Sequence, residues 1–500
     1  MKDYSLRRST AVQSRFAAAA HRSRSIAERI GVGIAALLIM VATSLLYAQP
    51  DSDEGDSIFG DTVVDDSADT ASEDVDSAAA GSGEMVIAAP PEKPAVMTLE
   101  NELLTDEREQ ELKVELLKKK YKSVLYAGEL KESSKEVLDM LAEYSVYRLS
   151  MKKYRGGLSE VAEELFRDIH IAASLQNKPS LASGFRRYFL DQVVTRTTDL
   201  LDGNFQVRMQ GVAVLIRLNL VEENPKEKTT AVAFLPASRP LLQVLDDEEQ
   251  LDGLKIPIIL GLGRIAATAD PNARLRVHIA TSVIRELAEK QAHWWYQLRL
   301  VEALGKINQL DDPSATGRPF IIIVLSETLA DKERHWLVRC EAARSLGRAR
   351  VNSDINLGLI AFEIAGLSRE VADAYNQEPN VFPWRECFWK LYLAFKPQNE
   401  EELRNKAGLL NKVTSAPNRK LVEEAYALVS PLTRYVFNNE NLRKKIPKAD
   451  LAKFDEWLAK SQPDDRSLAP GVAPIVSSNG SSAGPAGSER IVDAEPASSR

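Results

Sequence analysis

Leu262-Gly263-Arg264-Ile265 is the first of three similar tetrapeptides that are spaced 42 residues apart. The next two are Leu304-Gly305-Lys306-Ile307 and Leu346-Gly347-Arg348-Ala349. A further step of 42 residues reaches Phe388-Trp389-Lys390-Leu391, and Leu215-Ile216-Arg217-Leu218 lies 47 residues before the first copy. Self-similarity with a period in the 40s is typical of arrays in which each repeat is one supersecondary unit stacked on the next. We therefore expect a repeat protein.

The apolar residues around these strings follow helical spacing. The two sets that coincide under a shift of 42 residues are Trp294/Leu298/Val301/Leu304 and Trp336/Cys340/Ala343/Leu346. Steps of four, three and three residues stay on one face of an α-helix, so this face is predicted to be core. Because no segment between 98 and 462 alternates convincingly with a period of two, we expect helices and no sheet there.

The helical segments resemble HEAT repeats, a family of armadillo-like proteins. Arg239–Asp247 resembles the opening of a HEAT repeat, as do second helices that begin Val207-Arg208 and Val338-Arg339 and end in Leu-Gly. The resemblance covers about 215 residues. It implies an all-α fold, a right-handed α-solenoid of stacked helical hairpins, and it implies no activity.

One position of the resemblance carries charge. Seven residues before each recurring leucine or phenylalanine the chain has Arg208, Lys255, Gln297, Arg339 and Val381. In HEAT proteins this basic residue pairs with an acid in the preceding turns. The resemblance therefore implies that Asp202, Asp247 and Asp331 are the acidic partners.

Charge divides the chain unevenly. Residues 1–29 contain seven Lys and Arg against two acids, residues 30–50 contain no charge, and residues 51–92 contain thirteen acids and no Lys or Arg. The total of −8 leaves residues 93–500 neutral. A general nucleic-acid binder needs a basic footprint, so we expect no nucleic-acid partner.

The uncharged stretch Ile30–Gln49 is long enough to cross a bilayer. Basic residues before it and acidic residues after it predict a cytoplasmic N-terminus and an exported body. The stretch is either an uncleaved signal anchor or a signal peptide cleaved near Ala48, which would leave the body periplasmic or otherwise exported. A mitochondrial presequence is a third reading, since residues 5–29 are rich in Arg, Ser and Ala.

Composition predicts the organisation of the whole chain. The acidic segment and the C-terminal tail have too few large apolar side chains to offset the entropy of ordering, so we expect both to be disordered. The predicted parts are a basic leader (1–29), the apolar span (30–49), an acidic disordered linker (50–97), an N-terminal helical region (98–180), HEAT-like repeats (181–397), a C-terminal helical cap (398–462) and a disordered tail (463–500).

The residues with possible chemistry have simpler structural interpretations. Gly261-Leu262-Gly263-Arg264-Ile265-Ala266 matches a dinucleotide-binding pattern, but that mechanism needs a strand–turn–helix context. Gly263, Gly305 and Gly347 instead predict close approach of helices. His293 and His335 are expected to open second helices, and Cys340 and Cys387 to be small core residues. We expect no catalytic residues, no metal and no cofactor.

Arg264, Lys306, Arg348 and Lys390 share one repeat position, two residues after the core-facing leucine or phenylalanine. Two residues turn a helix by about 200°, so this column is predicted to face solvent. Its cations either compensate the helix dipoles or form a basic track for an extended acidic partner.

These features favour a non-catalytic scaffold, exported and membrane-associated through residues 30–49, that binds a protein or peptide. The alternatives are a HEAT-like enzyme of the lyase or glycosylase type and a purely structural spacer in the cell envelope.

Overall fold

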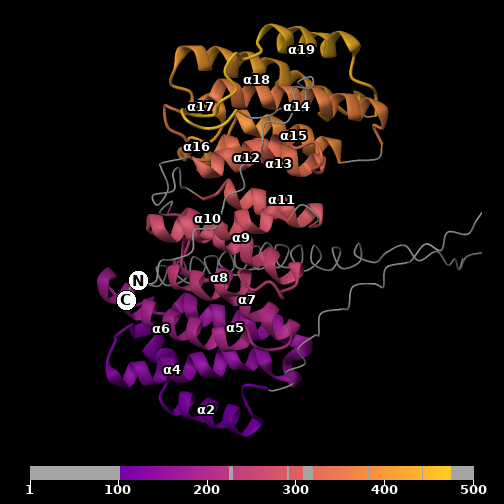
Figure 1. The fold of residues 1–500 in the computed structure, drawn as a ribbon. Helices are drawn as coiled ribbons and strands as arrows, with labels where there is room; N and C mark the ends of the chain where they lie inside the picture. The colour runs from indigo at the N-terminus through magenta and orange to yellow at the C-terminus, as the bar shows by residue number, and fades with distance from the viewer. Residues whose placement is uncertain are drawn as a thin grey trace, which may run out of the picture. The chain divides into compact units, whose positions relative to one another are not determined.

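The computed structural model describes residues 102–474, apart from 225–228, 290–291, 308–318, 381–382 and 442. The described residues belong to one compact unit, within Ala89–Arg500. These residues are mainly helical (Figure 1), which confirms the helical class predicted from the sequence. The predicted leader, apolar span and acidic linker lie outside them. Within the described residues, no helix is both long enough and apolar enough to cross a membrane.

The N-terminal helical region packs around the apolar face of α4. Its α4 contacts α2 on one side and α6 on another. The elements of this region are α2 (Asp106–Lys118), α3 (Tyr121–Ala127), α4 (Glu132–Tyr147), η1 (Arg148–Ser150), η2 (Lys152–Gly157) and α5 (Leu158–Ile171).

The next helices come in pairs, a first helix followed by a second helix. The first helices are α6 (Pro179–Leu200), α8 (Ser238–Leu245, preceded by η3, Leu235–Ala237), α10 (Ala273–Ala288), α12 (Phe320–Ala330) and α14 (Leu357–Gln377). The second helices are α7 (Phe205–Arg217), α9 (Asp252–Thr268), α11 (Trp294–Leu304), α13 (Trp336–Arg348) and α15 (Trp384–Phe395). Each second helix packs on the next one, from α7 through to α15.

The C-terminal helices cover the last pair, since α18 packs on both α14 and α15 and α19 packs on α14. These helices are α16 (Glu400–Arg404), α17 (Leu409–Lys412), α18 (Ala416–Phe437), η4 (Asn439–Asn441) and α19 (Lys448–Lys460).

Side-chain caps set where several helices begin. Asn204, Asn272 and Asn356 accept the backbone N–H three residues ahead at 2.9–3.1 Å, which satisfies one of the donors left free at a helix start. His293 and His335 do the same for α11 and α13, because each Nδ1 accepts the N–H two residues ahead. The prediction that these histidines open second helices is confirmed.

The recurring strings lie at the centre of the core. Leu262, Leu304 and Leu346 are at most 1% exposed. The glycine after each leucine meets the neighbouring second helix. A Cβ built on Gly263 would lie 3.3 Å from the Cα of Ala303, and one on Gly347 would lie 2.9 Å from the Cα of Ala394. The predicted close approach of helices is therefore confirmed.

The structure also contains a small sheet where none was predicted. The segment after α7 forms a hairpin in which β1 (Asn219–Val221) pairs antiparallel with β2 (Val232–Ala233). Phe234 N–H donates to the carbonyl of Leu218 at 3.0 Å and extends this pairing. The strands are only two and three residues long, too short for a period of two to be recognised in the sequence.

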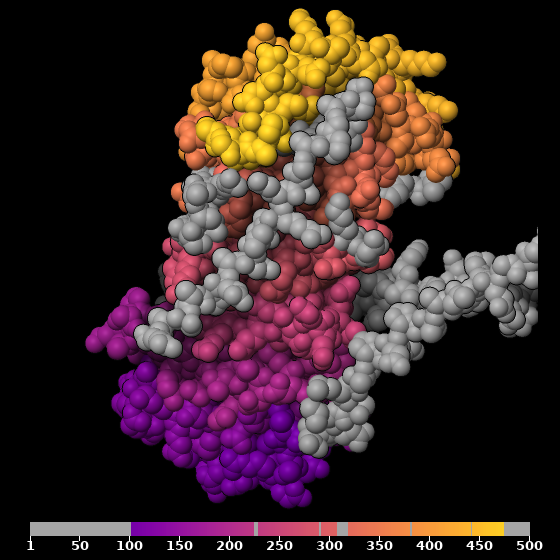
Figure 2. Space-filling view, in the orientation of Figure 1, coloured from indigo at the N-terminus to yellow at the C-terminus, as the bar shows by residue number. Residues whose placement is uncertain are grey.

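The folded part also continues beyond the predicted boundary at residue 462. Leu468 and Ala469 are buried, and the backbone N–H of Asn356 donates to the carbonyl of Leu468 at 2.8 Å. Arg466 forms an ion pair with Glu363 of α14. Figure 2 shows this C-terminal part, in yellow, lying over the orange helices. Two apolar side chains in a Pro- and Ser-rich segment were too few to reveal this contact in the sequence.

The basic position of the repeats pairs forward along the chain. Lys255 reaches Glu286 at 3.1 Å and Arg339 reaches Glu370 at 2.9 Å, in each case 31 residues ahead on the following first helix. Arg208 has no acid at the equivalent position, because the residue 31 positions ahead of it is Arg239. Arg208 donates instead to the side chain of Gln250 at 2.6 Å. The predicted partners of Arg208 and Lys255 in the preceding turns, Asp202 and Asp247, were therefore wrong.

Candidate protein-interaction surface

The predicted basic column does not form an open track. Lys390 is only 7% exposed, and its Nζ lies 2.5 Å from Glu341 Oε2. The guanidinium of Arg264 donates to the carbonyls of Ile216 and Leu218 at 2.6 and 3.0 Å. For these two residues the prediction that the column faces solvent was wrong. These second helices pack against helices on more than one side, so a residue that points away from one contact meets another.

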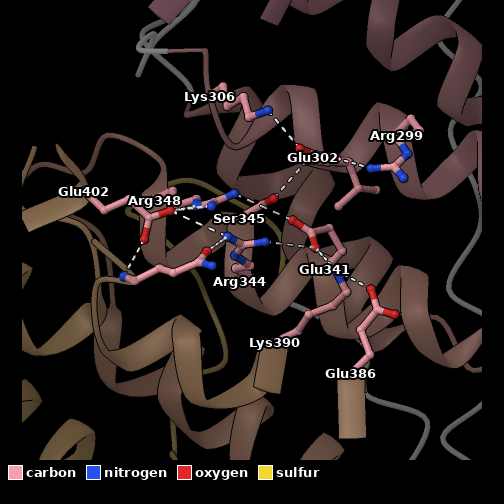
Figure 3. A network of polar contacts seen from close by, with 12 residues as sticks. Arg299, Glu302, Lys306, Glu341, Arg344, Ser345, Arg348, Glu386, Lys390 and Glu402 are labelled. Atoms are coloured by element: carbon pink, nitrogen blue, oxygen red, sulfur yellow. Dashed lines mark hydrogen bonds and ion pairs between the residues drawn. The ribbon is translucent and has the colours of Figure 1, made fainter. Parts of the chain in front are cut away.

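The other two residues of the column, Lys306 and Arg348, are also held by acids of the same chain. Lys306 Nζ lies 2.8 Å from Glu302, and Arg348 Nε donates to Glu402 at 2.9 Å. Figure 3 shows these residues and Lys390 in one network of charges that extends over α11, α13, α15 and α16. The column therefore lies among intramolecular ion pairs.

The acids of this network differ in how far they are buried. Glu341 is 1% exposed. Burial by itself would raise the pKa of the Glu302 carboxyl, but the charges and hydrogen bonds of Lys306 and Arg299 lower it to about 2. Removing one partner of a buried ion pair leaves an uncompensated charge in the protein interior, which typically costs ~3–5 kcal/mol of stability. The Glu341–Lys390 pair joins the second helices α13 and α15, and the Arg348–Glu402 pair joins α13 to α16.

A different basic region, on α15 and α18, is accessible. We call it the α15–α18 surface, and it contains four aromatic and three basic residues. These are Trp389, Tyr392, Tyr426, Phe437, Arg385, Lys396 and Arg434. Trp389 is 38% exposed and Phe437 is 43% exposed, large fractions for side chains of this size. A contiguous exposed patch of aromatic side chains is typical of a protein-interaction site, whereas single exposed apolar side chains are common on any surface.

The aromatic rings of this surface form one connected array. Trp389 stacks on Tyr392 with ring centres 5.5 Å apart and planes 11° apart, and it also touches Phe437 at 5.9 Å. Tyr392 in turn meets Tyr426 at 5.9 Å. Offset and tilted ring contacts of this kind fix side chains without hiding them from solvent. The array therefore presents exposed ring faces in a fixed arrangement.

Cations lie at the edges of the array. The guanidinium carbon of Arg385 lies 5.8 Å from the centre of the Phe437 ring, and Lys396 Nζ lies 5.0 Å from that of Tyr426. A hydrogen bond with Tyr426, together with the negative charge of the ionised Tyr426 hydroxyl, raises the pKa of Lys396. The hydrogen bond with Tyr426 and burial raise the pKa of the Tyr392 hydroxyl, and the positive charge of Arg434 partly opposes this rise.

A basic loop continues from this surface. Arg443, Lys444, Lys445 and Lys448 are exposed, and none has an acidic partner within the part of the chain that the structure describes. The loop backbone is fixed, because Tyr375 Oη donates to the carbonyl of Lys444 and Tyr435 Oη to that of Lys445, both at 3.0 Å.

The loop is also anchored at Ile446. Ile446 is buried, and its backbone exchanges two hydrogen bonds with the side chain of Asn376. Arg385 connects the loop to the aromatic array, since it also donates to Asn439 at 3.4 Å. Its positive charge also acts to lower the pKa of the Tyr375 hydroxyl, which burial raises. Residues 434–448 contain five basic residues and one acid. The loop therefore adds a rigid positive edge to the aromatic array.

Sequence reasoning missed this surface although two signals were present. Trp389 occupies the position that is glycine in three other repeats, and an exposed tryptophan replaces the close contact found there. The run Arg443-Lys444-Lys445-Ile446-Pro447-Lys448 concentrates charge in a body that is neutral as a whole. Only the tertiary structure places the two features side by side.

Comparison of the chain with protein-family models, with curated proteins and with solved structures finds no match. Among the described residues, no group of three or more His, Cys, Asp or Glu side chains is placed to hold a metal ion.

Proposed function

We propose that this chain is a protein-binding scaffold without catalytic activity, and that its α15–α18 surface and basic loop bind an acidic segment carrying aromatic or aliphatic side chains. The observation that carries the proposal is the pair of exposed rings, Trp389 and Phe437, bordered by cations that have no acidic partner among the residues that the structure describes. Tryptophan, tyrosine and arginine supply most of the binding energy at protein interfaces. Rim cations accelerate encounter with an acidic partner.

We further propose that the paired helices form a right-handed α-solenoid similar to HEAT repeats. The 42-residue spacing of the strings, the alternation of first and second helices and the packing of successive second helices support this arrangement. Such arrays offer long surfaces with nearest-neighbour packing and commonly bind extended partners. The α15–α18 surface would then lie near the C-terminal end of the array.

The proposed location follows from the charge pattern before and after residues 30–49. A signal anchor there would leave the N-terminus in the cytoplasm and the helical body outside it, and cleavage would release the body. Protease added to intact spheroplasts should degrade the body. Protection until lysis would contradict export and would leave the binding proposal untouched.

The binding test uses the full-length chain and three fluorescent peptides of equal length. One contains acids and phenylalanines, one contains acids and serines, and one contains glutamines and phenylalanines. We expect the first to bind at least about tenfold more tightly than either of the others, because ring contacts and charge contacts both contribute. Equal binding of all three, or no binding, would contradict the proposal. A purely structural spacer would give no binding.

A further inference from the structure

The two cysteines of the chain lie next to each other in the core. Cys340 is on α13, Cys387 is on α15, and both are 0% exposed. The two helices pack on each other, and the Cys340 thiol contributes to raising the pKa of the Cys387 thiol, so the two groups are neighbours. Both cysteines are free in this structure. Two small core residues need not have met in this way, because each second helix offers several buried positions to its neighbour.

Neighbouring contacts show that this meeting follows from the packing register. Gly347 lies against Ala394, and both this pair and the cysteine pair are separated by 47 residues. Between them, Glu341 pairs with Lys390 at 2.5 Å. Because residue numbers rise together along both helices, α13 and α15 run parallel at the two cysteines. The contact of Gly347 with the Ala394 backbone also means that the two helices approach closely.

We propose that Cys340 and Cys387 form a disulfide bond that fastens α13 to α15 when the chain folds under oxidising conditions. A disulfide requires Cα atoms about 4.4–6.8 Å apart, a range that ordinary helix pairs exceed and that closely packed helices reach. The bond would join two consecutive second helices and would anchor α15, whose outer face carries Trp389 and Tyr392.

The reaction needs an oxidant, and a low-molecular-weight disulfide such as glutathione disulfide supplies it. The thiolate of one cysteine attacks the oxidant and forms a mixed disulfide, releasing one thiol. The second cysteine then attacks the mixed disulfide, the Sγ–Sγ bond forms, and the second thiol leaves. The protein loses two protons and two electrons, and the oxidant is reduced to two thiols.

The bond is expected to form while the chain folds. Burial raises the pKa of the Cys387 thiol, and the contact with Cys340 adds to this, so the reactive thiolate is scarce in the native state. A disulfide formed during folding would be inaccessible to reductants in the native state, because both cysteines are buried. The proposal concerns the redox state during folding and does not depend on the binding function proposed above.

The test refolds the full-length chain either in glutathione disulfide with a little glutathione or in dithiothreitol. Helical content is checked by circular dichroism, and the thiols are then counted with a maleimide after denaturation. We expect no reactive thiol after oxidative refolding and two after reductive refolding. Intact mass should be about 2 Da lower in the oxidised form, and the Tm of the oxidised form should be about 5 °C higher.

The variants Cys340→Ala and Cys387→Ala serve as controls and should each lose the difference in Tm between the two conditions. Two reactive thiols in oxidatively refolded chain of native helical content would overturn the proposal. A glutathione adduct or a disulfide-linked dimer in place of the internal bond would overturn it equally.

Discussion

Trp389 and Tyr392 form an offset, nearly parallel stack three residues apart on α15, with ring centres separated by 5.5 Å and planes inclined by 11°. Residues three apart on a helix are neighbours, so the stack needs no distortion of the backbone. The indole is held in place although 38% of its surface is open to solvent. A side chain ordered in this way loses little conformational entropy when a partner covers it.

The first prediction concerns the exposed rings. Replacing both Trp389 and Phe437 with alanine should weaken binding of the acidic, phenylalanine-containing peptide by about 30-fold, which corresponds to the ~2 kcal/mol of an interface hot spot. The matched control is Leu403→Ala on α16, a side chain that is 57% exposed and lies outside the α15–α18 surface. Fluorescence anisotropy measures the affinity. Equal losses in the two variants would show that the rings are not the contact.

The second prediction concerns the basic loop. Lys444→Glu combined with Lys445→Glu should slow association with the same peptide about tenfold at low salt and reduce its salt dependence, because rim charges act mainly on encounter. The Tm should hardly change, since Tyr375 and Tyr435 bind the loop through backbone carbonyls.

Stopped-flow fluorescence at two salt concentrations measures the effect of the loop charges. The control is Lys113→Glu combined with Lys120→Glu, two exposed lysines at α2 and its C-terminal flank. An association rate that falls equally in both double variants would indicate a general effect of net charge and no specific role of the loop.

The third prediction compares two glycines that differ in what surrounds them. A Cβ on Gly305 would lie 2.7 Å from the Cβ of Ser345, whereas one on Gly366, inside α14, meets nothing within 4 Å. Gly305→Ala should therefore destabilise the chain by ~1–3 kcal/mol through overpacking. Gly366→Ala should stabilise it by up to ~1 kcal/mol through helix propensity. Urea unfolding gives both values, and the same sign of change at both positions would refute the close-approach argument.

The fourth prediction concerns pH. Lys412 donates to the carbonyls of Arg348 and Ala349 at 3.1 and 2.8 Å, and burial lowers its pKa to about 8 from a usual 10.5. Between these values the unfolded chain carries this proton and the folded chain does not. The contribution of Lys412 to the free energy of unfolding should therefore rise as pH increases from 8 to 10.5.

Lys412→Met removes this group, so the difference between wild type and variant isolates it. The free energy of unfolding of the wild type, minus that of the variant, should increase between pH 7.5 and pH 10. Urea unfolding at the two pH values measures this difference. A constant difference would mean that Lys412 keeps its proton over the whole range when folded.

Regular periodicity accounts for what could be predicted. The burial of Leu262, Leu304 and Leu346 and the close approach at Gly263 and Gly347 followed from the 42-residue spacing. So did the capping of second helices by His293 and His335. These features repeat, and each depends on residues within one helix or on its contact with an equivalent helix.

The basic column shows where such reasoning fails. A helical wheel correctly turns Lys390 away from Phe388, but it contains no information about the neighbour that lies on the other side. Glu341 of α13 occupies that side and buries the lysine. The same limitation concealed the forward pairing of Lys255 with Glu286, because the partner lies on a helix whose position depends on the whole pair.

The sequence by itself determined the helical class, the repeat spacing and the apolar residues that make the core, because hydrophobic burial acts on local patterns that recur. Only the tertiary structure decided which charges are internal and which are accessible, since burial of a cation depends on helices from other parts of the chain. It also brought Cys340 to Cys387 and the Trp389 array to the basic loop. Those meetings depend on the register between helices, and no local pattern encodes that register.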